Sequence, residues 1–201
     1  MTSIYSTISH YATGISSRAV ETILVVLLAT PVLMGSVSYG QDSDSFPPVT
    51  DAMLQDPAPS DWLMWRRTLD SWGYSPLEEV NRDNVDQLRM VWTHGLATGT
   101  GEITPLAYDG VLYVPQHNDV IEAIDARTGD PIWEYGRDHP EGLYDYVGVN
   151  ARNNRNLAIF ENLIINTSDD GFVFALDAQT GETVWETQVF DYKVNTGTHS
   201  A

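Results

Sequence analysis

An internal repeat in the second half of the chain constrains the fold more than any other feature. The stretch Ala123–Glu134 recurs with conservative changes as Ala175–Glu186, 52 residues later. The match continues upstream without a gap, because Val111–Val114 falls on Leu163–Asn166 at the same spacing. A period in this range is typical of a propeller blade, a sheet of four short antiparallel strands. The repeat therefore predicts an all-β fold built from such blades.

The residue types within the repeat predict where strands end and turns begin. Residues 120–124 and 172–176 are rich in strand-forming side chains. Asp125 and Asp177 follow directly and can accept hydrogen bonds from turn amides. Four pairs place a glycine where a hairpin reverses: Asp109-Gly110, Thr128-Gly129, Asp170-Gly171 and Thr180-Gly181. We expect these residues to be structural rather than catalytic.

A tryptophan stands near the end of each repeat. Trp133 follows Ile132 and Trp185 follows Val184, where an outer strand is expected to start. A large aromatic side chain at this place can bury its area only against a neighbouring unit. We therefore expect each tryptophan to wedge against the next blade. The chain holds two complete repeats, and we interpret the stop at Ala201, where a third would begin, as a truncation.

Two shorter segments precede the first full repeat. Ser75–Glu78 offers an N-cap serine, a proline at the first helical position and a glutamate three residues after the cap, which predicts a short helix. Leu88–Trp92 predicts a lone strand that ends in tryptophan. It matches the outer strand of a blade that is completed elsewhere in the ring, where closure would bury the sheet edges.

The composition excludes several classes of protein. Acidic residues outnumber basic ones 28 to 10, which gives a formal net charge of −18. This sign disfavours a nucleic acid or an anionic membrane surface as the partner. It favours solubility, or alternatively attraction of a basic partner protein. The chain has no cysteine, which excludes a disulfide, a cysteine-ligated zinc and a c-type haem attachment within it. Its five histidines show no metal-ligand spacing.

The first forty residues are predicted to be a targeting segment. An apolar run, Ile23–Met34, precedes small residues and a Ser38-x-Gly40 cleavage pattern, which is typical of a secretory signal peptide over residues 1–40. The run is shorter than the ~20 residues of a membrane-spanning helix. We expect a periplasmic protein without stable membrane insertion after cleavage; the alternative is an uncleaved anchor. Residues 41–60, rich in proline and aspartate, are predicted to be a linker.

Several motifs in residues 61–201 resemble one family when taken together. They are Asp61–Thr68, Tyr74–Leu77, the Asn84-Leu88-Trp92 spacing, Gly101–Leu106, and Asn154–Asn156 followed by Asp170-Gly171. This combination is similar to the PQQ-dependent alcohol dehydrogenases, quinoproteins of the methanol and ethanol dehydrogenase type. The resemblance covers the whole presumed mature region. The tryptophan repeat alone is less specific, because propellers without enzymatic activity share it.

The resemblance implies an eight-bladed β-propeller of which this chain holds the first two to three blades. It implies PQQ on the propeller axis beside a calcium or lanthanide ion that acts as a Lewis acid on the quinone. A carboxylate base would take the alcohol proton while hydride passes to the cofactor. The implied substrate is a small-molecule alcohol, and the implied electron acceptor is a cytochrome c.

Few residues of the implied active site fall within this chain. Glu102 matches a glutamate that hydrogen-bonds PQQ, and Arg155 matches an arginine that contacts its oxygens. Thr198 aligns more loosely with a threonine near the cofactor. The metal ligands and the catalytic aspartate are expected beyond Ala201, so we predict no catalytic or metal residue here and an inactive fragment. Val149-Asn150 stands where the family often has adjacent cysteines.

Two other functions remain open at this point. One is a non-catalytic scaffold of the cell envelope built from the same PQQ-like repeats. Such scaffolds are usually lipoproteins, and the missing cysteine counts against that class. The other is a membrane-bound sugar-oxidising quinoprotein, which should show several membrane-spanning helices. This chain shows at most one apolar run of comparable length.

Overall fold

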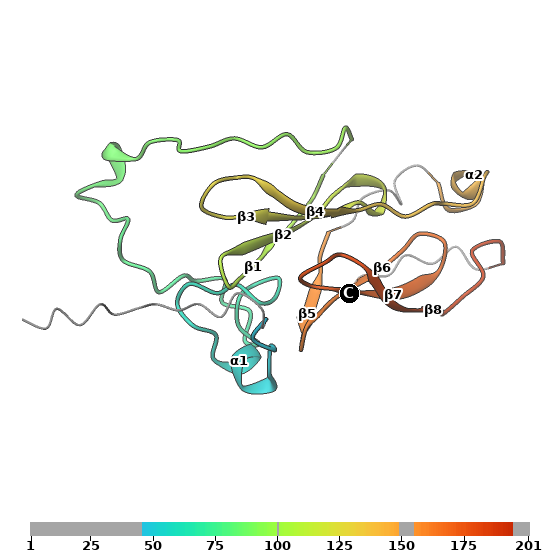
Figure 1. Ribbon diagram of the computed structural model, residues 1–201, viewed down its shortest axis with the longest axis horizontal. Coiled ribbons are helices and arrows are strands. Elements are labelled where there is room, and N and C mark those ends of the chain that lie inside the picture. Colours follow the sequence, from blue (N-terminus) through green and yellow to red (C-terminus); the bar gives the residue numbers. More distant parts are fainter. Residues whose placement is uncertain (1–45, 100, 149–154, 195–201) are drawn as a thin grey trace, which may run out of the picture. The chain divides into compact units, whose positions relative to one another are not determined.

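Two four-stranded antiparallel sheets dominate the structure (Figure 1). The computed structural model describes residues 46–99, 101–148 and 155–194, all within a compact unit that spans residues 42–201. Blade 1 contains β1 (Leu106–Tyr108), β2 (Val111–Pro115), β3 (Ile121–Asp125) and β4 (Pro131–Tyr135). Blade 2 contains β5 (Ala158–Phe160), β6 (Leu163–Thr167), β7 (Phe172–Asp177) and β8 (Thr183–Gln188). The predicted all-β fold is confirmed.

Helical structure in the described residues is limited to single turns. The α-helical turns are α1 (Asp51–Gln55) and α2 (Leu143–Val147). The 3-10 turns are η1 (Val85–Gln87) and η2 (His117–Asp119). Because each is shorter than the ~12 residues at which an isolated helix becomes marginally stable, each depends on neighbouring contacts. None of the described helices is long and apolar enough to cross a membrane.

The two sheets repeat one another down to individual strand pairs. In both sheets, neighbouring strands follow one another in the sequence. Tyr113 pairs with Ala123 in blade 1, and Ile165 pairs with Ala175 at the equivalent place in blade 2. The third and fourth strands of both blades slip register directly after that alanine. The strands predicted over residues 120–124 and 172–176 are confirmed, shifted by one residue at most. The 52-residue sequence period is therefore a structural period.

The predicted aspartate turns form in both blades. Asp125 Oδ1 accepts the amide hydrogens of Arg127 and Thr128 at 2.8 and 3.1 Å. Asp177 Oδ1 accepts the corresponding pair at 2.9 and 3.0 Å. The hydrogen bond from the Arg127 amide is the main reason that the pKa of Asp125 lies below its ordinary value. These bonds occupy backbone donors that the strand ladder does not reach.

Trp133 joins blade 1 to blade 2, as its predicted role requires. Its indole Nε1 donates to the carbonyl oxygen of Ala178 at 3.0 Å. The ring lies against Gly181, where an added Cβ would stand 2.7 Å from two ring atoms. Gly181 has φ +73°, a conformation that side-chain-bearing residues rarely adopt. Glycine is thus needed here both for the backbone conformation and for the close approach of the indole.

Trp92 makes the same contact on blade 1 although its strand does not form. Its Nε1 donates to the Ala126 carbonyl at 3.1 Å, and a Cβ on Gly129 would stand 2.6 Å from the ring. The predicted strand over Leu88–Trp92 is wrong for the described residues: Met90 and Val91 are exposed, and no ladder forms. A strand is stable only with a hydrogen-bonded neighbour, and none of the described strands pairs with this segment.

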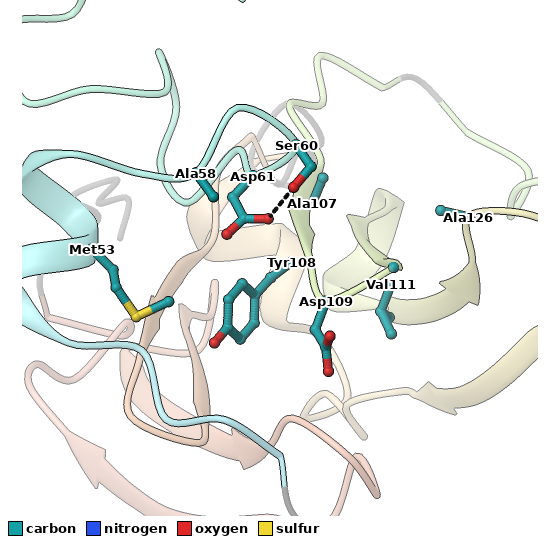
Figure 2. A pocket seen from close by; sticks show the side chains of 10 residues that line it. Met53, Ala58, Ser60, Asp61, Ala107, Tyr108, Asp109, Val111 and Ala126 are labelled. Carbon is teal, nitrogen blue, oxygen red and sulfur yellow. Dashed lines mark hydrogen bonds between the residues drawn. The ribbon is translucent and has the colours of Figure 1, made fainter. Parts of the chain in front are cut away.

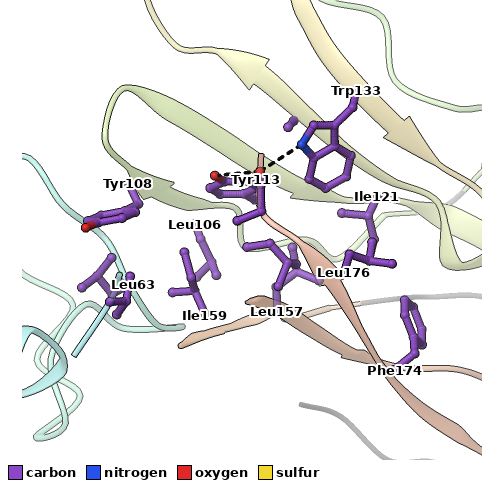
Figure 3. Packing of buried hydrophobic residues seen from close by; sticks show 14 residues of the cluster. Leu63, Leu106, Tyr108, Tyr113, Ile121, Trp133, Leu157, Ile159, Phe174 and Leu176 are labelled. Carbon is purple, nitrogen blue, oxygen red and sulfur yellow. Dashed lines mark hydrogen bonds between the residues drawn. The ribbon is translucent and has the colours of Figure 1, made fainter. Parts of the chain in front are cut away.

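The core lies mainly between the two blades and under the residues that precede them (Figure 3). Tyr113 and Trp133 lean on one another at a centroid distance of 6.0 Å, and the Tyr113 hydroxyl donates to the Ala178 carbonyl at 3.2 Å. Burial is the main cause that raises the pKa of Tyr113 far above its ordinary value. The other large members of the cluster are Leu63, Leu106, Tyr108, Ile121, Leu157, Ile159, Ile164, Phe174 and Leu176.

The described part of the predicted linker packs onto both blades. Val49 is fully buried and exchanges backbone hydrogen bonds of 2.9 and 2.8 Å with Glu161, which lies between β5 and β6. Phe46 packs edge-on against Tyr108 at 5.4 Å, and the Tyr108 hydroxyl donates to Pro47. Residues 46–55 of the predicted linker therefore pack as part of the folded unit. A few apolar residues suffice because a preformed core receives them.

The predicted helix at Ser75–Glu78 does not form. The Ser75 hydroxyl accepts the Leu77 amide hydrogen at 3.4 Å, but the chain continues without helical structure to η1. Leu77 and Val80 are about half exposed, so an apolar helix face would have nothing to pack against. Capping alone does not offset the cost of nucleating a short helix. The predicted signal peptide, residues 1–40, lies outside the described residues.

Candidate functional site

Glu102 and Arg155, the two described residues with a predicted cofactor role, form an ion pair. Arg155 Nε donates to Glu102 Oε2 at 2.6 Å. The Arg155 and Glu102 side chains are 57% and 59% exposed. The two segments also meet through their backbones, because the Thr104 amide donates to the Arg155 carbonyl at 2.9 Å. The third residue, Thr198, lies outside the described residues.

The blade architecture explains why residues 53 positions apart meet. Glu102 lies four residues before β1, and Arg155 lies three residues before β5. These are the equivalent first strands of two blades packed against one another, so their leading segments run side by side. Leu157, two residues after Arg155, is anchored in the core between the blades. Packing of the blades thus places the carboxylate and the guanidinium within hydrogen-bond distance.

The pair leaves donor capacity for a further anion. The hydrogen bond that Arg155 makes among the described residues uses Nε, so both Nη groups remain for another acceptor. A guanidinium presents its N–H groups as a planar fork that matches a carboxylate. Since both side chains are more than half exposed, the ion pair itself adds little stability. The pair is therefore accessible from solvent and contributes little to holding the blades together.

A second charged cluster, absent from the sequence predictions, centres on Arg137 after β4. Its Nε and Nη2 donate to Asp170 at 3.0 and 2.9 Å, and its Nη1 donates to Glu186 at 2.9 Å. The guanidinium also lies over the Phe172 ring, 4.7 Å from its centroid. Burial opposes the charged form, but the hydrogen bonds to Asp170 and Glu186 outweigh it and raise the pKa of Arg137. Arg137 therefore ties blade 1 to blade 2.

A third polar group fills the turn between β2 and β3. His139 Nε2 and Asp119 Oδ2 lie 2.9 Å apart, and the Tyr144 hydroxyl donates to Asn118 at 2.8 Å. Asn118 and Asp119 both have positive φ, at 69° and 56°. Their side-chain bonds hold this uncommon backbone conformation. Asp119 Oδ2 also accepts the Asp169 amide hydrogen at 3.2 Å, so the group spans both blades.

A fourth polar group lies on the other side of blade 1, around the buried Glu122. His94 Nε2 lies 2.8 Å from Glu122 Oε1, and Gln116 Nε2 donates to Glu122 Oε2 at 2.8 Å. Gln116 Oε1 in turn accepts the Ala97 amide hydrogen at 2.5 Å. A signal for this group exists in the sequence: Glu122 stands in the repeat where blade 2 has Phe174. A charged residue where the other repeat has a buried aromatic residue indicates that its carboxylate has a polar partner.

A cavity of about 550 Å³ opens at the far end of β1 from Glu102 (Figure 2). Met53, Asp61, Tyr108 and Asp109 lie in its wall. The Ser60 hydroxyl donates to Asp61 Oδ1 at 3.0 Å. Burial first, and then the charges of Asp109 and Asp61, raise the pKa of the Tyr108 phenol. The lining of the cavity includes neither Glu102 nor Arg155.

Residues 46–99, 101–148 and 155–194 contain no group of three or more histidine, aspartate or glutamate side chains placed to hold a metal ion. The three histidines in these ranges have other surroundings. His94 and His139 lie beside carboxylates, and His117 packs its ring against the backbone of Gly99.

Comparison with known proteins gives consistent matches. Residues 62–187 match the PQQ family described as "Glucose/ethanol/alcohol dehydrogenase, beta-propeller domain". The dehydrogenase subunit of the quinone alcohol dehydrogenase from Gluconacetobacter polyoxogenes is 34% identical over 166 residues, which is 82% of this chain and 22% of that protein. The chain thus spans about a fifth of the length of such relatives.

Solved structures agree with the sequence matches. Quinohemoprotein alcohol dehydrogenase ADHIIG from Pseudomonas putida superposes with a TM-score of 0.63 at 32% identity, covering 73% of this chain and 22% of that one. A europium-containing methanol dehydrogenase superposes with a TM-score of 0.61 at 28% identity, covering 67% of this chain and 24% of that one.

Proposed function

Since the chain belongs to the glucose/ethanol/alcohol dehydrogenase β-propeller family of PQQ proteins, we propose that it forms the N-terminal part of a periplasmic enzyme that oxidises alcohols. The names of its relatives, quinone and quinohemoprotein alcohol dehydrogenases, support an alcohol substrate. A relative from Thauera butanivorans is named 1-butanol dehydrogenase (cytochrome c), which supports a cytochrome c acceptor. In this proposal the chain supplies two blades and part of the cofactor site.

The observation that carries the proposal is the Glu102–Arg155 pair. PQQ is a quinone that bears carboxylates, and the Nη groups of Arg155, which make no hydrogen bond to the described residues, suit one of them. Glu102 holds the guanidinium in place through its 2.6 Å bond and can accept a hydrogen bond from the cofactor. Thr198 is proposed as a further contact on the basis of its sequence match. The donor set therefore fits the cofactor that the family implies.

When bound, PQQ beside a calcium or lanthanide ion supplies the electrophilic quinone that accepts hydride from the alcohol. The residues of this chain do not take part in that transfer. Arg155 binds and orients an anionic edge, and Glu102 fixes the arginine. The net charge of −18 would attract a basic electron acceptor to the protein.

The decisive experiment uses the full-length protein purified from the periplasm without PQQ. Titration with PQQ, followed by fluorescence, gives the Kd, and dye-linked assays with a panel of primary alcohols give the activity. We expect activity only when PQQ and calcium or a lanthanide are both added. A protein that neither binds PQQ nor oxidises any alcohol in the panel supports the non-catalytic scaffold instead.

A pair of arginine variants tests the site itself. Arg155→Ala should raise the Kd for PQQ by about 10- to 100-fold, because a charge-assisted hydrogen bond is lost. Arg127→Ala is the matched control, because the Arg127 side chain is 86% exposed and lies 3.6 Å from the Asp125 carboxylate. Equal PQQ affinity in wild type and Arg155→Ala would remove Arg155 from the site.

N-terminal sequencing of the periplasmic protein tests the predicted export. We expect the mature chain to begin shortly after Gly40. A chain that keeps residues 1–40 and sediments with membranes supports the anchor instead.

A further inference from the structure

Residues 92–99, which precede Glu102, are described without strand pairing and contact blade 1 through polar side chains and backbone groups. Trp92 is fixed by its bond to the Ala126 carbonyl, and His94 meets Glu122 at 2.8 Å. Five residues after Trp92, the Ala97 amide donates to Gln116 Oε1 at 2.5 Å. The ring of His117 then lies so close to Gly99 that a Cβ there would overlap it. These contacts reach to within three residues of Glu102.

Glu122 and Gln116 form the centre of this arrangement. Glu122 is only 4% exposed, and its two carboxylate oxygens are divided between His94 and Gln116. The Gln116 amide uses its nitrogen for Glu122 and its oxygen for Ala97. The chain of bonds therefore starts and ends on the same segment, at His94 and at the Ala97 backbone. It fixes two points of that segment on the ends of β2 and β3.

The equivalent contact one repeat later, between the end of β4 and blade 2, is made without such a polar group. One repeat later, Phe174 replaces Glu122, and Tyr135, two residues after Trp133, takes the place that His94 has after Trp92. Tyr135 and Phe174 pack with a centroid distance of 5.2 Å. This pair lies beside the Arg137 guanidinium, 5.5 Å from the Phe174 ring centroid, but it buries no carboxylate and so avoids its desolvation cost. What the polar group at blade 1 offers in addition is the Gln116 oxygen that accepts the Ala97 amide hydrogen.

We propose that Glu122, Gln116 and His94 are positioning residues that hold residues 94–99, so that Glu102, three residues later, presents its carboxylate to Arg155 and the cofactor. The inference rests on the proposed role of Glu102 toward PQQ. The reason lies in the bond to Ala97: a glutamine held by a carboxylate fixes a backbone amide at a definite place. An aromatic pair can bury the same space but offers no acceptor for that amide. The buried carboxylate of Glu122 lowers the stability of the fold, but it fixes the position of the segment before Glu102.

The test replaces the polar group of blade 1 with the aromatic pair found at the equivalent contact with blade 2. In the full-length protein, His94→Tyr combined with Glu122→Phe reproduces the Tyr135–Phe174 pair. We expect the variant to melt close to the wild-type temperature, because removal of the buried carboxylate offsets the loss of the acceptor for Gln116 Nε2. At the same time the Kd for PQQ should rise about tenfold, as is typical when partners behind a ligand-binding side chain are removed. Hydrogen exchange of the Ala97 amide in the PQQ-free protein should become faster.

Tyr135→Phe, which removes one hydroxyl from the aromatic pair, is the matched control and should change neither the Kd nor the exchange of Ala97. A double variant that binds PQQ as tightly as wild type overturns the positioning role while leaving the proposed function intact. A wild-type protein that binds no PQQ overturns both.

If the double variant fails to fold, Gln116→Ala supplies a second test, because it removes the acceptor of the Ala97 amide without inserting a large side chain. The Kd should then rise about threefold, with faster exchange at Ala97. Unchanged values for both quantities contradict the inference.

Discussion

Trp133 and Trp185 hold the same position in two nearly identical blades, yet their surroundings differ. Trp133 is 9% exposed, and its indole bonds to Ala178. Trp185 is 39% exposed. The turn at Ala126–Gly129 already receives the indole of Trp92, and the turn at Ala178–Gly181 receives that of Trp133. The burial of each tryptophan therefore depends on whether a neighbouring turn receives its indole ring.

The same difference extends along the outer strands. Val184 and Val189, which flank Trp185, are each about half exposed. Arg137 stands one repeat before Val189 and is buried against blade 2. A blade therefore buries its outer face only when another blade follows it, which is the general behaviour of repeat proteins.

The largest effect is expected from removing the docked tryptophan. Trp133→Ala should lower the free energy of unfolding of this chain by about 4 kcal/mol, because it empties a buried space between the blades. Trp185→Ala should cost about 1 kcal/mol or less, since the side chain is already partly in water. Urea unfolding followed by circular dichroism measures both. Equal losses for the two variants contradict the comparison.

Filling the turn that receives Trp133 should have the next largest effect. Gly181→Ala costs about 1–2 kcal/mol for the left-handed backbone and about 2 kcal/mol more for the clash with the indole. Gly110→Ala is the control, because Gly110 has a similar φ of +77° with nothing near its missing Cβ. The difference between the two variants measures the docking contact alone. If the two lose the same stability, the close approach to Trp133 is not energetically important.

Arg137 provides a second, smaller tie between the blades that blade 2 lacks at Val189. Arg137→Lys keeps the charge but loses the two-pronged bond to Asp170, and should cost about 2 kcal/mol. Glu186→Gln leaves that bond intact and should cost less, since Glu186 is half exposed. Chemical unfolding of the two variants gives the order, and a reversed order argues against Asp170 as the main partner.

The smallest effect concerns the turn that both blades share. The Arg127 amide lowers the pKa of Asp125, so the charged carboxylate favours the folded state. That contribution is present above the pKa of the unfolded chain and is lost as pH falls through the lower pKa of the folded state. In the Asp125→Asn variant, the free energy of unfolding should therefore fall slightly less steeply as the pH is lowered. Carbon-13 NMR titration of the Asp125 carboxylate checks the direction, and an ordinary or raised pKa refutes it.

The correct sequence predictions share a local origin. Asp125, Asp177 and the following glycines determine turns through bonds that span only two or three residues. Such geometry is encoded in neighbouring side chains and can be recognised without knowing the fold. The repeat itself then gave the strand order, because four strands in one period leave few ways to pair.

The wrong predictions depended on partners far along the chain. Ser75–Glu78 has a helix-start pattern but no surface to pack on, and Leu88–Trp92 has a strand pattern but no strand beside it among the described residues. Val49 shows the opposite case, since a segment without visible periodicity is buried by a core assembled from later residues. Neither the presence nor the absence of a receiving surface can be seen in a local pattern.

The blade period and the turns could be predicted from the sequence, because they follow from residue types and hydrogen bonds within one repeat, and the family could be predicted from motifs that lie mostly outside the repeat. The sequence also supplied Glu102 and Arg155 as separate candidates. The packing of the blades brings the two together at 2.6 Å and places His94 beside the buried Glu122 rather than beside an aromatic ring. The physical reason is that repeats specify their own backbone, whereas the contacts between blades depend on which side chains two different repeats bring to the same place.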